Sequence, residues 1–138
     1  MAAKDFYHEQ VKVALGKDGW TVTHDPLTLD WDNRDVQIDL AAEKLLFAQK
    51  DARRIAVEVK SFLSSSLLQD LYAALGQFLL YRKALQNTEP ERELFLAVRE
   101  AVWQSLLDRT DSAELLRDYD VKLLVFDERL EAITQWIS

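Results

Sequence analysis

The run Arg54–Phe62 constrains the fold most, because it is typical of a β-strand that is apolar on one face and charged on the other. Residues two apart in a strand share a face, so its aliphatic residues lie together while Glu58 and Lys60 point the opposite way. Burial in a sheet accounts for the aliphatic face. It does not account for a carboxylate and an ammonium on the other face, and this strand is therefore the first candidate for a functional site.

A second short strand, Val36–Leu40, carries a lone acid, Asp39, near its end. An acid on one strand and Glu-x-Lys on the next is the layout of a metal-dependent phosphodiesterase site. Two carboxylates hold a divalent cation, and the lysine orients water or screens the phosphate charge. The triplet alone is not specific, since Asp120–Lys122 repeats it without a partner acid. An ordinary cross-strand charge pair is the structural alternative for Glu58 and Lys60.

Glu43 competes with Asp39 for the role of the second-strand acid. We expect a hairpin turn at Lys50–Arg53, and simple pairing across it places Glu43 nearer to Lys60 than Asp39 is. Asp39 takes this position only if the chain bends at residues 41–42. We prefer Asp39 and keep Glu43 as the alternative.

Composition limits which kinds of protein and of site the chain can form. The 138 residues are 49% hydrophobic with three glycines and two prolines, which indicates a single compact domain over residues 1–138. There is no cysteine for a disulfide or thiolate ligand, and two histidines exclude a His-rich metal site. No signal peptide and no membrane-length apolar run is recognised, so we expect a cytoplasmic protein without membrane contact. The net charge of −7 disfavours DNA binding by the chain alone.

Periodicity predicts the order helix, three strands, long helix, strand, helix, strand, which is one α/β sandwich with a mixed sheet. The long helix runs from Leu67 to about Gln86 with a leucine stripe, after a capping box of Ser66 and Gln69. Asp30–Asp35 is expected to be an acidic loop. The other expected elements are helices at 4–16, 100–107 and 111–119 and strands at 20–24, 45–49, 94–98, 121–126 and 132–137.

The segments Val36–Leu40, Ile55–Phe62 and Gly76–Tyr81 together resemble the XisH family of the PD-(D/E)XK nuclease superfamily. Members of this family are cyanobacterial excision controlling factors of the fdxN element, and they act with a partner, XisI, in developmental excision of DNA. The resemblance covers nearly the whole chain. It implies a restriction-endonuclease-like α/β domain with a mixed central β-sheet flanked by helices.

The resemblance also implies the roles of the strand residues. Asp39 and Glu58 would bind Mg²⁺ or Mn²⁺, and Lys60 would be the catalytic lysine. The sequence departs from the superfamily pattern at Ile38, since no proline precedes the acid.

Two further residues enter the expected catalytic set from helices. Glu9 matches the acid that many members of the superfamily place on the first helix, and Gln77 matches a polar position one turn before Tyr81. His8, beside Glu9, is expected at a surface position of the first helix.

The function implied is control of DNA element excision with Mg²⁺-dependent phosphodiester hydrolysis. The alternative is a catalytically silent nuclease-fold scaffold that acts through a partner in site-specific recombination, which the acidic charge favours. A third reading is a toxin or defence component that cleaves RNA. We expect DNA contact through a complex with an XisI-like partner, and Trp136 is a candidate contact for that partner or for a homodimer.

Overall fold

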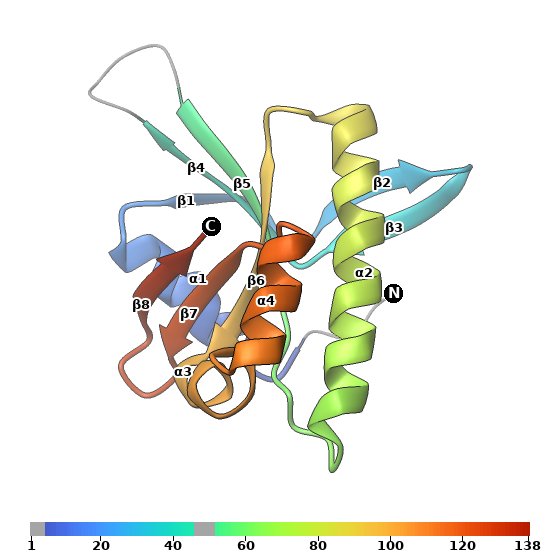
Figure 1. The fold of residues 1–138 in the computed structure, drawn as a ribbon. Helices are drawn as coiled ribbons and strands as arrows, with labels where there is room; N and C mark the ends of the chain where they lie inside the picture. The colour runs from blue at the N-terminus through green and yellow to red at the C-terminus, as the bar shows by residue number, and fades with distance from the viewer. Residues whose placement is uncertain (1–4, 46–51) are drawn as a thin grey trace.

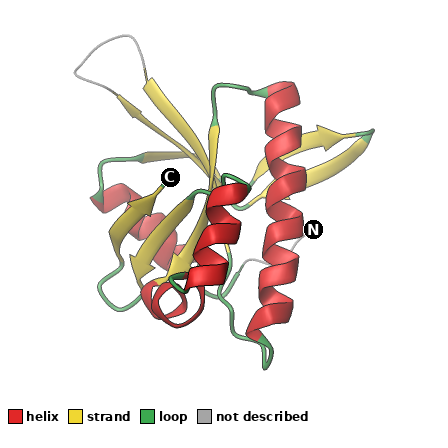
Figure 2. Cartoon of the chain, viewed as in Figure 1, coloured by secondary structure: helices red, strands yellow, loops and turns green. Residues whose placement is uncertain are grey.

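The computed structural model describes residues 5–45 and 52–138, which form a six-stranded sheet, a separate hairpin and helices on both faces of the sheet (Figures 1 and 2). The strand order is β1-β4-β5-β6-β7-β8. The three central strands are parallel: β5 (Ala52–Val59), β6 (Glu93–Arg99) and β7 (Leu123–Asp127). The outer strands pair antiparallel: β1 (Thr21–His24), β4 (Leu40–Leu45) and β8 (Ala132–Ile137). The predicted α/β fold with a mixed central sheet and flanking helices is confirmed.

Parallel strands need long crossover connections, and helices supply them here. α2 (Leu67–Thr88) joins β5 to β6. The second crossover, from β6 to β7, contains α3 (Glu100–Val102), the π-helix η1 (Trp103–Leu107) and α4 (Thr110–Asp118). α2 and α4 cover one face of the sheet, and α1 (His8–Lys17) covers the other (Figure 1).

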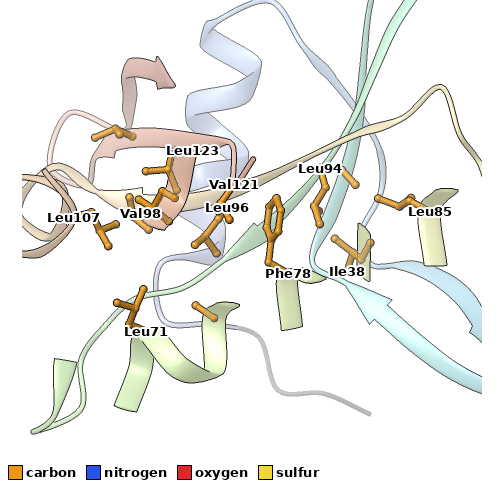
Figure 3. Packing of buried hydrophobic residues seen from close by; sticks show 14 of the residues in the cluster. Ile38, Leu71, Phe78, Leu85, Leu94, Leu96, Val98, Leu107, Val121 and Leu123 are labelled. Carbon is orange, nitrogen blue, oxygen red and sulfur yellow. The ribbon is translucent and has the colours of Figure 1, made fainter. Parts of the chain in front are cut away.

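Each face of the sheet has its own apolar core. Figure 3 shows part of the core on the α2 side, where Phe78 of α2 packs with Ile38 and with Leu96 of β6. The aliphatic residues of β5 lie in the core on the α1 side, as predicted, so Glu58 faces α2.

In the α1-side core Trp136 packs edge-on against Phe95, with ring centroids 5.0 Å apart. This tryptophan therefore has a contact within the chain, and its role toward a partner stays a prediction.

The start of α2 follows the predicted capping. The Ser66 hydroxyl accepts a hydrogen bond from the Gln69 backbone N–H at 3.3 Å. The predicted leucine stripe is wrong in part. Leu71 is buried as expected, but Leu68 and Leu79 are exposed, because the buried face of α2 follows Leu71 and Phe78.

β2 (Leu27–Trp31) and β3 (Arg34–Ile38) pair antiparallel in a hairpin that was not predicted from the sequence. The expected acidic loop Asp30–Asp35 is therefore wrong, because it is the tip of this hairpin. Asp32 and Asn33 form the turn with φ of 52° and 66°. A two-residue hairpin turn with both residues at positive φ matches the right-handed twist of its strands. The leucines of β2 point inward and are buried under α2.

The predicted strand Val36–Leu40 is interrupted at Asp39. β3 ends at Ile38, Asp39 lies on a bend, and β4 begins at Leu40. The bend expected at Ala41 and Ala42 is wrong, because both alanines pair in β4 with β1 and β5. The chain turns two residues earlier, and the acid itself occupies the turn.

The remaining differences concern ends of elements. The expected strand 45–49 lies outside the described residues except for its first residue, and so does half of the turn Lys50–Arg53. Ala52 and Arg53 of that turn belong to β5. α1 begins at His8, later than the predicted residue 4, and α4 begins at Thr110, so Asp111 lies in its first turn instead of capping it. Among the described residues no helix is long and apolar enough to cross a membrane.

Candidate metal and catalytic site

Asp39 and Glu58 meet where the bend between β3 and β4 lies beside the end of β5. The Asp39 backbone N–H donates to Glu58 Oε1 at 3.1 Å. In return, Asp39 Oδ2 accepts from the Val59 backbone N–H at 2.7 Å. Glu58 is 9% exposed and Asp39 is half-buried. The two backbone bonds fix both carboxyl groups, and the predicted neighbourhood of these acids is confirmed.

Strand register explains why Asp39 and not Glu43 reaches Glu58. Leu40 pairs with Val57, so the residue before Leu40 comes beside the residue after Val57. Glu43 pairs instead with Arg54, whose Nε lies 3.0 Å from Glu43 Oε1. Glu43 is thus held in an ion pair toward the far end of β4, and the preference for Asp39 is geometrically correct.

Burial and mutual repulsion govern the protonation of the pair. Burial, followed by the negative charge of Asp39, raises the pKa of Glu58 to about 9. Burial also raises the pKa of Asp39, against the effect of its hydrogen bonds with Val59 and with the Glu58 carboxyl. With a pKa of about 9, the Glu58 carboxyl holds its proton at neutral pH.

Asp5 is a third acid near Asp39 and Glu58, and it was not predicted from the sequence. Its Oδ2 accepts from the Ser61 backbone N–H at 3.1 Å, and its Oδ1 accepts from the Ser61 hydroxyl. Its charge raises the pKa of both Glu58 and Asp39. Asp5 and Ser61 are 56 positions apart, so no local pattern could have paired them. We refer to Asp5, Asp39 and Glu58 as the carboxylate cluster.

Lys60 lies at the edge of the carboxylate cluster. It follows the last residue of β5, is half-buried, and donates its backbone N–H to Ala97 O at 3.1 Å. Its ammonium acts on Asp5 and lowers the pKa of that carboxyl, against the larger effect of burial. The next carbonyl, that of Ser61, accepts from Arg99 Nη2 at 2.9 Å. The segment after β5 is therefore held in place by β6, and Lys60 stays near the acids.

His8 was expected at the surface, and this is wrong. It is 3% exposed, and its Nε2 lies 2.7 Å from Asp25 Oδ1, while Lys12 Nζ lies 2.9 Å from Asp25 Oδ2. A charge on His8 would lower the pKa of Asp39, so this network borders the carboxylate cluster. The spacing of His8, Val11 and Leu15 is the signal that was overlooked, because it places the histidine on the buried face of α1.

Glu9 is exposed on α1. Ligand atoms of Glu9, His8 and Asp25 lie within 4.8 Å of one another. The Lys12 ammonium already neutralises Asp25 there. The structure thus places the predicted helix acid with the histidine network, and its catalytic role stays a prediction.

The two polar positions on α2 differ in placement. Tyr81 is half-buried, and burial, followed by the charges of Glu58 and Asp39, raises the pKa of its hydroxyl to about 12. Gln77, one turn earlier, is exposed. Tyr81 therefore faces the carboxylate cluster from α2, whereas the proposed part of Gln77 in the site stays a prediction.

The donors of the carboxylate cluster fit a hard divalent cation. All are carboxylate oxygens, which suit Mg²⁺ and Mn²⁺. Within residues 5–45 and 52–138, no lysine or arginine forms an ion pair with Asp39 or Glu58. Burial raises both pKa values, and no lysine or arginine of these residues offsets it through an ion pair. A cation bound by Asp39 and Glu58 would take the place of the proton on Glu58.

Fold and site define an α/β protein with buried and half-buried acids gathered at the carboxyl end of a parallel strand. The family model described as XisH protein matches residues 1–134, and the chain belongs to this family. Its relation to the PD-(D/E)XK superfamily stays a prediction.

Two solved structures resemble the chain over its length. One, an XisH family protein from Nostoc punctiforme PCC 73102, is 41% identical with a TM-score of 0.88 and covers 97% of this chain and 100% of its own. The other, an fdxN element excision controlling factor protein from Anabaena variabilis, is 40% identical with a TM-score of 0.87 and covers 98% and 100%. No curated protein matches the chain significantly.

Proposed function

We propose that this protein acts in the control of DNA element excision by metal-dependent phosphodiester hydrolysis at the carboxylate cluster. The observation that carries the chemistry is the pair of the buried Glu58 and the half-buried Asp39. A 3.1 Å hydrogen bond joins them, and neither has an ion-pair partner among the described residues. The excision role is supported by the Anabaena variabilis relative, which is described as an excision controlling factor.

Each residue of the site has a part that follows from its position. Asp39 and Glu58 would hold Mg²⁺ or Mn²⁺, and a bound metal supplies the positive charge that activates water and stabilises the phosphate. Lys60 would place its ammonium beside the phosphate. Tyr81 keeps its proton, because the pKa of its hydroxyl is raised to about 12, and it can donate a hydrogen bond to a bound anion. Glu9 and Gln77 would complete the surroundings of the site from α1 and α2.

DNA would reach this site through a complex. The net charge of −7 opposes the approach of a polyanion, so the cations that grip DNA must come from elsewhere. An XisI-like partner protein would supply them. We expect no tight DNA binding by the chain alone at physiological salt, and salt-dependent binding by the complex.

A catalytically silent scaffold is the second candidate, and the charge of the chain favours it. A subunit that organises a recombination complex need not contact DNA itself. The fold would then be retained for its surfaces, and the acids would add no chemistry.

Cleavage by the complex separates these two functions. The purified chain with its partner is incubated with DNA that carries the boundaries of an excised element, in Mg²⁺ or Mn²⁺. We expect cleavage that Lys60→Ala reduces by at least about 100-fold, the range of a residue that stabilises transition-state charge. Lys17→Ala is the matched control, because Lys17 lies at the far end of α1 and contacts the Leu130 carbonyl. Binding without cleavage, with excision unaffected by Lys60→Ala, would establish the scaffold.

A further inference from the structure

α2 carries a second apolar stripe next to the side that faces the core, and of this stripe Leu75 also packs against the core. Leu68, Tyr72, Leu75 and Leu79 follow one another at spacings of four, three and four residues. This is the a/d spacing of a helix that packs against another helix. Leu68, Tyr72 and Leu79 are 53%, 58% and 42% exposed. The exposed members of the stripe add little to the core, because Phe78 and its neighbours bury a different side of α2.

α4 forms a second wall beside this stripe. In Figure 1 the two helices stand side by side on the same face of the sheet, and a pocket of about 310 Å³ lies between them. The pocket is lined by Leu75, Leu79, Leu115, Tyr119 and Val121. We call this hollow the α2–α4 groove. Leu115 and Tyr119 are 37% and 56% exposed, so both walls present apolar side chains to solvent.

The walls of the groove are held together before any partner arrives. Arg82 of α2 donates from Nη1 to the carbonyl of Tyr119 at 2.8 Å and to that of Asp120 at 2.9 Å. These bonds join α2 to the end of α4. A preformed groove reduces the entropy lost on binding.

The rim of the groove on α4 is acidic. Asp111 and Asp118 are exposed, four residues before and three residues after Leu115, so they lie on the same side of the helix as that leucine. A second copy of the chain would bring a further charge of −7 and the same acidic rim. Nucleic acid would also be repelled. On the α2 wall Lys83 is exposed four residues after Leu79, so the two walls differ in charge. Charge complementarity therefore favours an occupant that is basic on the side facing α4.

We propose that the α2–α4 groove binds an amphipathic helix of a partner protein, with lysine or arginine beside its apolar face. Such a helix places anchors at positions i, i+3, i+4 and i+7 in an apolar groove. The stripe on α2 and the two α4 side chains offer partners for these anchors, and Asp111 and Asp118 pair with the flanking cations. The groove and the carboxylate cluster lie on different sides of α2. Binding of a helix in the groove can therefore be tested independently of hydrolysis.

Two designed peptides test the proposal on the intact chain. Both are helices of about 18 residues with leucine at the anchor positions, and their flanking residues are lysine in one and glutamate in the other. Fluorescence anisotropy at low salt should show the lysine peptide binding at least about tenfold tighter than the glutamate peptide. Equal affinity for the two peptides would overturn the choice of a basic partner.

Variants locate the binding. The double change Leu79→Gln and Leu115→Gln replaces two exposed apolar side chains of the groove with polar ones. It should weaken binding of the lysine peptide by at least about tenfold. Leu130→Gln is the matched control, since Leu130 is 65% exposed in the turn between β7 and β8, and it should bind normally. An unchanged affinity of the double variant would overturn the proposed site, provided that circular dichroism shows an unaltered melting curve.

Charge reversal and oligomeric state complete the test. Asp111→Lys with Asp118→Lys should reverse the preference in favour of the glutamate peptide. Analytical ultracentrifugation of the unmodified chain should show that the groove is free in solution. A dimer that dissociates in the Leu79→Gln and Leu115→Gln variant would show that a second copy fills the groove, and this would overturn the proposal.

Discussion

Glu58 and Glu93 lie at opposite ends of one pair of parallel strands. Their charged neighbours have opposite signs, since those of Glu58 are acids and those of Glu93 are cations. Glu93 begins β6, where its carboxyl contacts Lys122 Nζ at 3.1 Å and Arg53 Nε at 3.3 Å. Burial opposes ionisation of Glu93, but hydrogen bonds from these two cations lower its pKa. Glu58 lies near the end of β5, where burial and the charge of Asp39 raise its pKa to about 9.

The contrast shows that Glu93 is neutralised by neighbouring cations, whereas Glu58 lies beside other acids. At the amino end of the parallel strands, cations neutralise the acid and join neighbouring elements. At the carboxyl end, Asp39 and Asp5 add negative charge to the surroundings of Glu58. Ligands bind outside the carboxyl ends of strands in open α/β sheets, and strongly perturbed acids concentrate at functional sites. We interpret the carboxylate cluster as a place where folding stability is given up for binding.

The largest expected effect is on metal affinity. Glu58→Gln removes a charged ligand and should weaken Mn²⁺ binding roughly 100-fold, on the order of 3 kcal/mol, by isothermal titration calorimetry. Glu93→Gln is the matched control and should leave the affinity unchanged. Equal effects of the two changes would remove the distinction between the two ends of the strands.

The next expected effect is on the pH dependence of that affinity. Since the pKa of Glu58 is raised to about 9, a metal ion must displace its proton at neutral pH. Mn²⁺ affinity should therefore rise about tenfold per pH unit between about pH 6 and pH 8. Calorimetry in buffers of different ionisation enthalpy should detect about one proton released per ion. Affinity independent of pH over this range would contradict a protonated Glu58 carboxyl at neutral pH.

A smaller effect is expected on stability without metal. The pKa of Glu58 is higher in the folded than in the unfolded chain, so folding stability is fully present at low pH and falls as pH rises from about 4.5 toward about 9. A glutamine stays neutral and can keep both hydrogen bonds to Asp39. Glu58→Gln should therefore raise the free energy of unfolding by about 2 kcal/mol near pH 8 and by almost nothing near pH 4, in urea titrations. A loss of stability at about pH 8 would contradict this.

The smallest expected effect has the opposite sign. Glu93→Gln removes two ion pairs whose members are all partly exposed, so it should lower the free energy of unfolding by only about 0.5 kcal/mol at neutral pH. Because the pKa of Glu93 is lowered on folding, its contribution is present above the unfolded pKa and disappears as pH falls below it. Urea titrations at about pH 7 and pH 3 would measure both values. A stabilising Glu93→Gln would show that the two glutamates do not differ as described.

Local sequence determined the parts of this protein that depend on near neighbours along the chain. The alternation in β5 predicted the strand and the face of Glu58, and the apolar run at 94–98 predicted the buried strand β6. Ser66 and Gln69 predicted where α2 begins. The strand and the start of the helix could be predicted because strand pleat and capping act over at most four residues. Asp39 and Glu58 were foreseen on other grounds, from an acid on one strand with Glu-x-Lys on the next and from the resemblance to a known family.

Tertiary structure alone decided which groups share the site. Ser61 forms a hydrogen bond with Asp5, which lies 56 positions away in the sequence, and Asp25 contacts His8, which lies 17 positions away. The position of the bend at Asp39 depended on the pairing of β4 with two other strands at once. The side of α2 that is buried, marked by Phe78, was set by the sheet on which the helix packs. A pattern along the chain records which side chains are apolar or charged, but the distance between remote residues depends on how the packed elements meet.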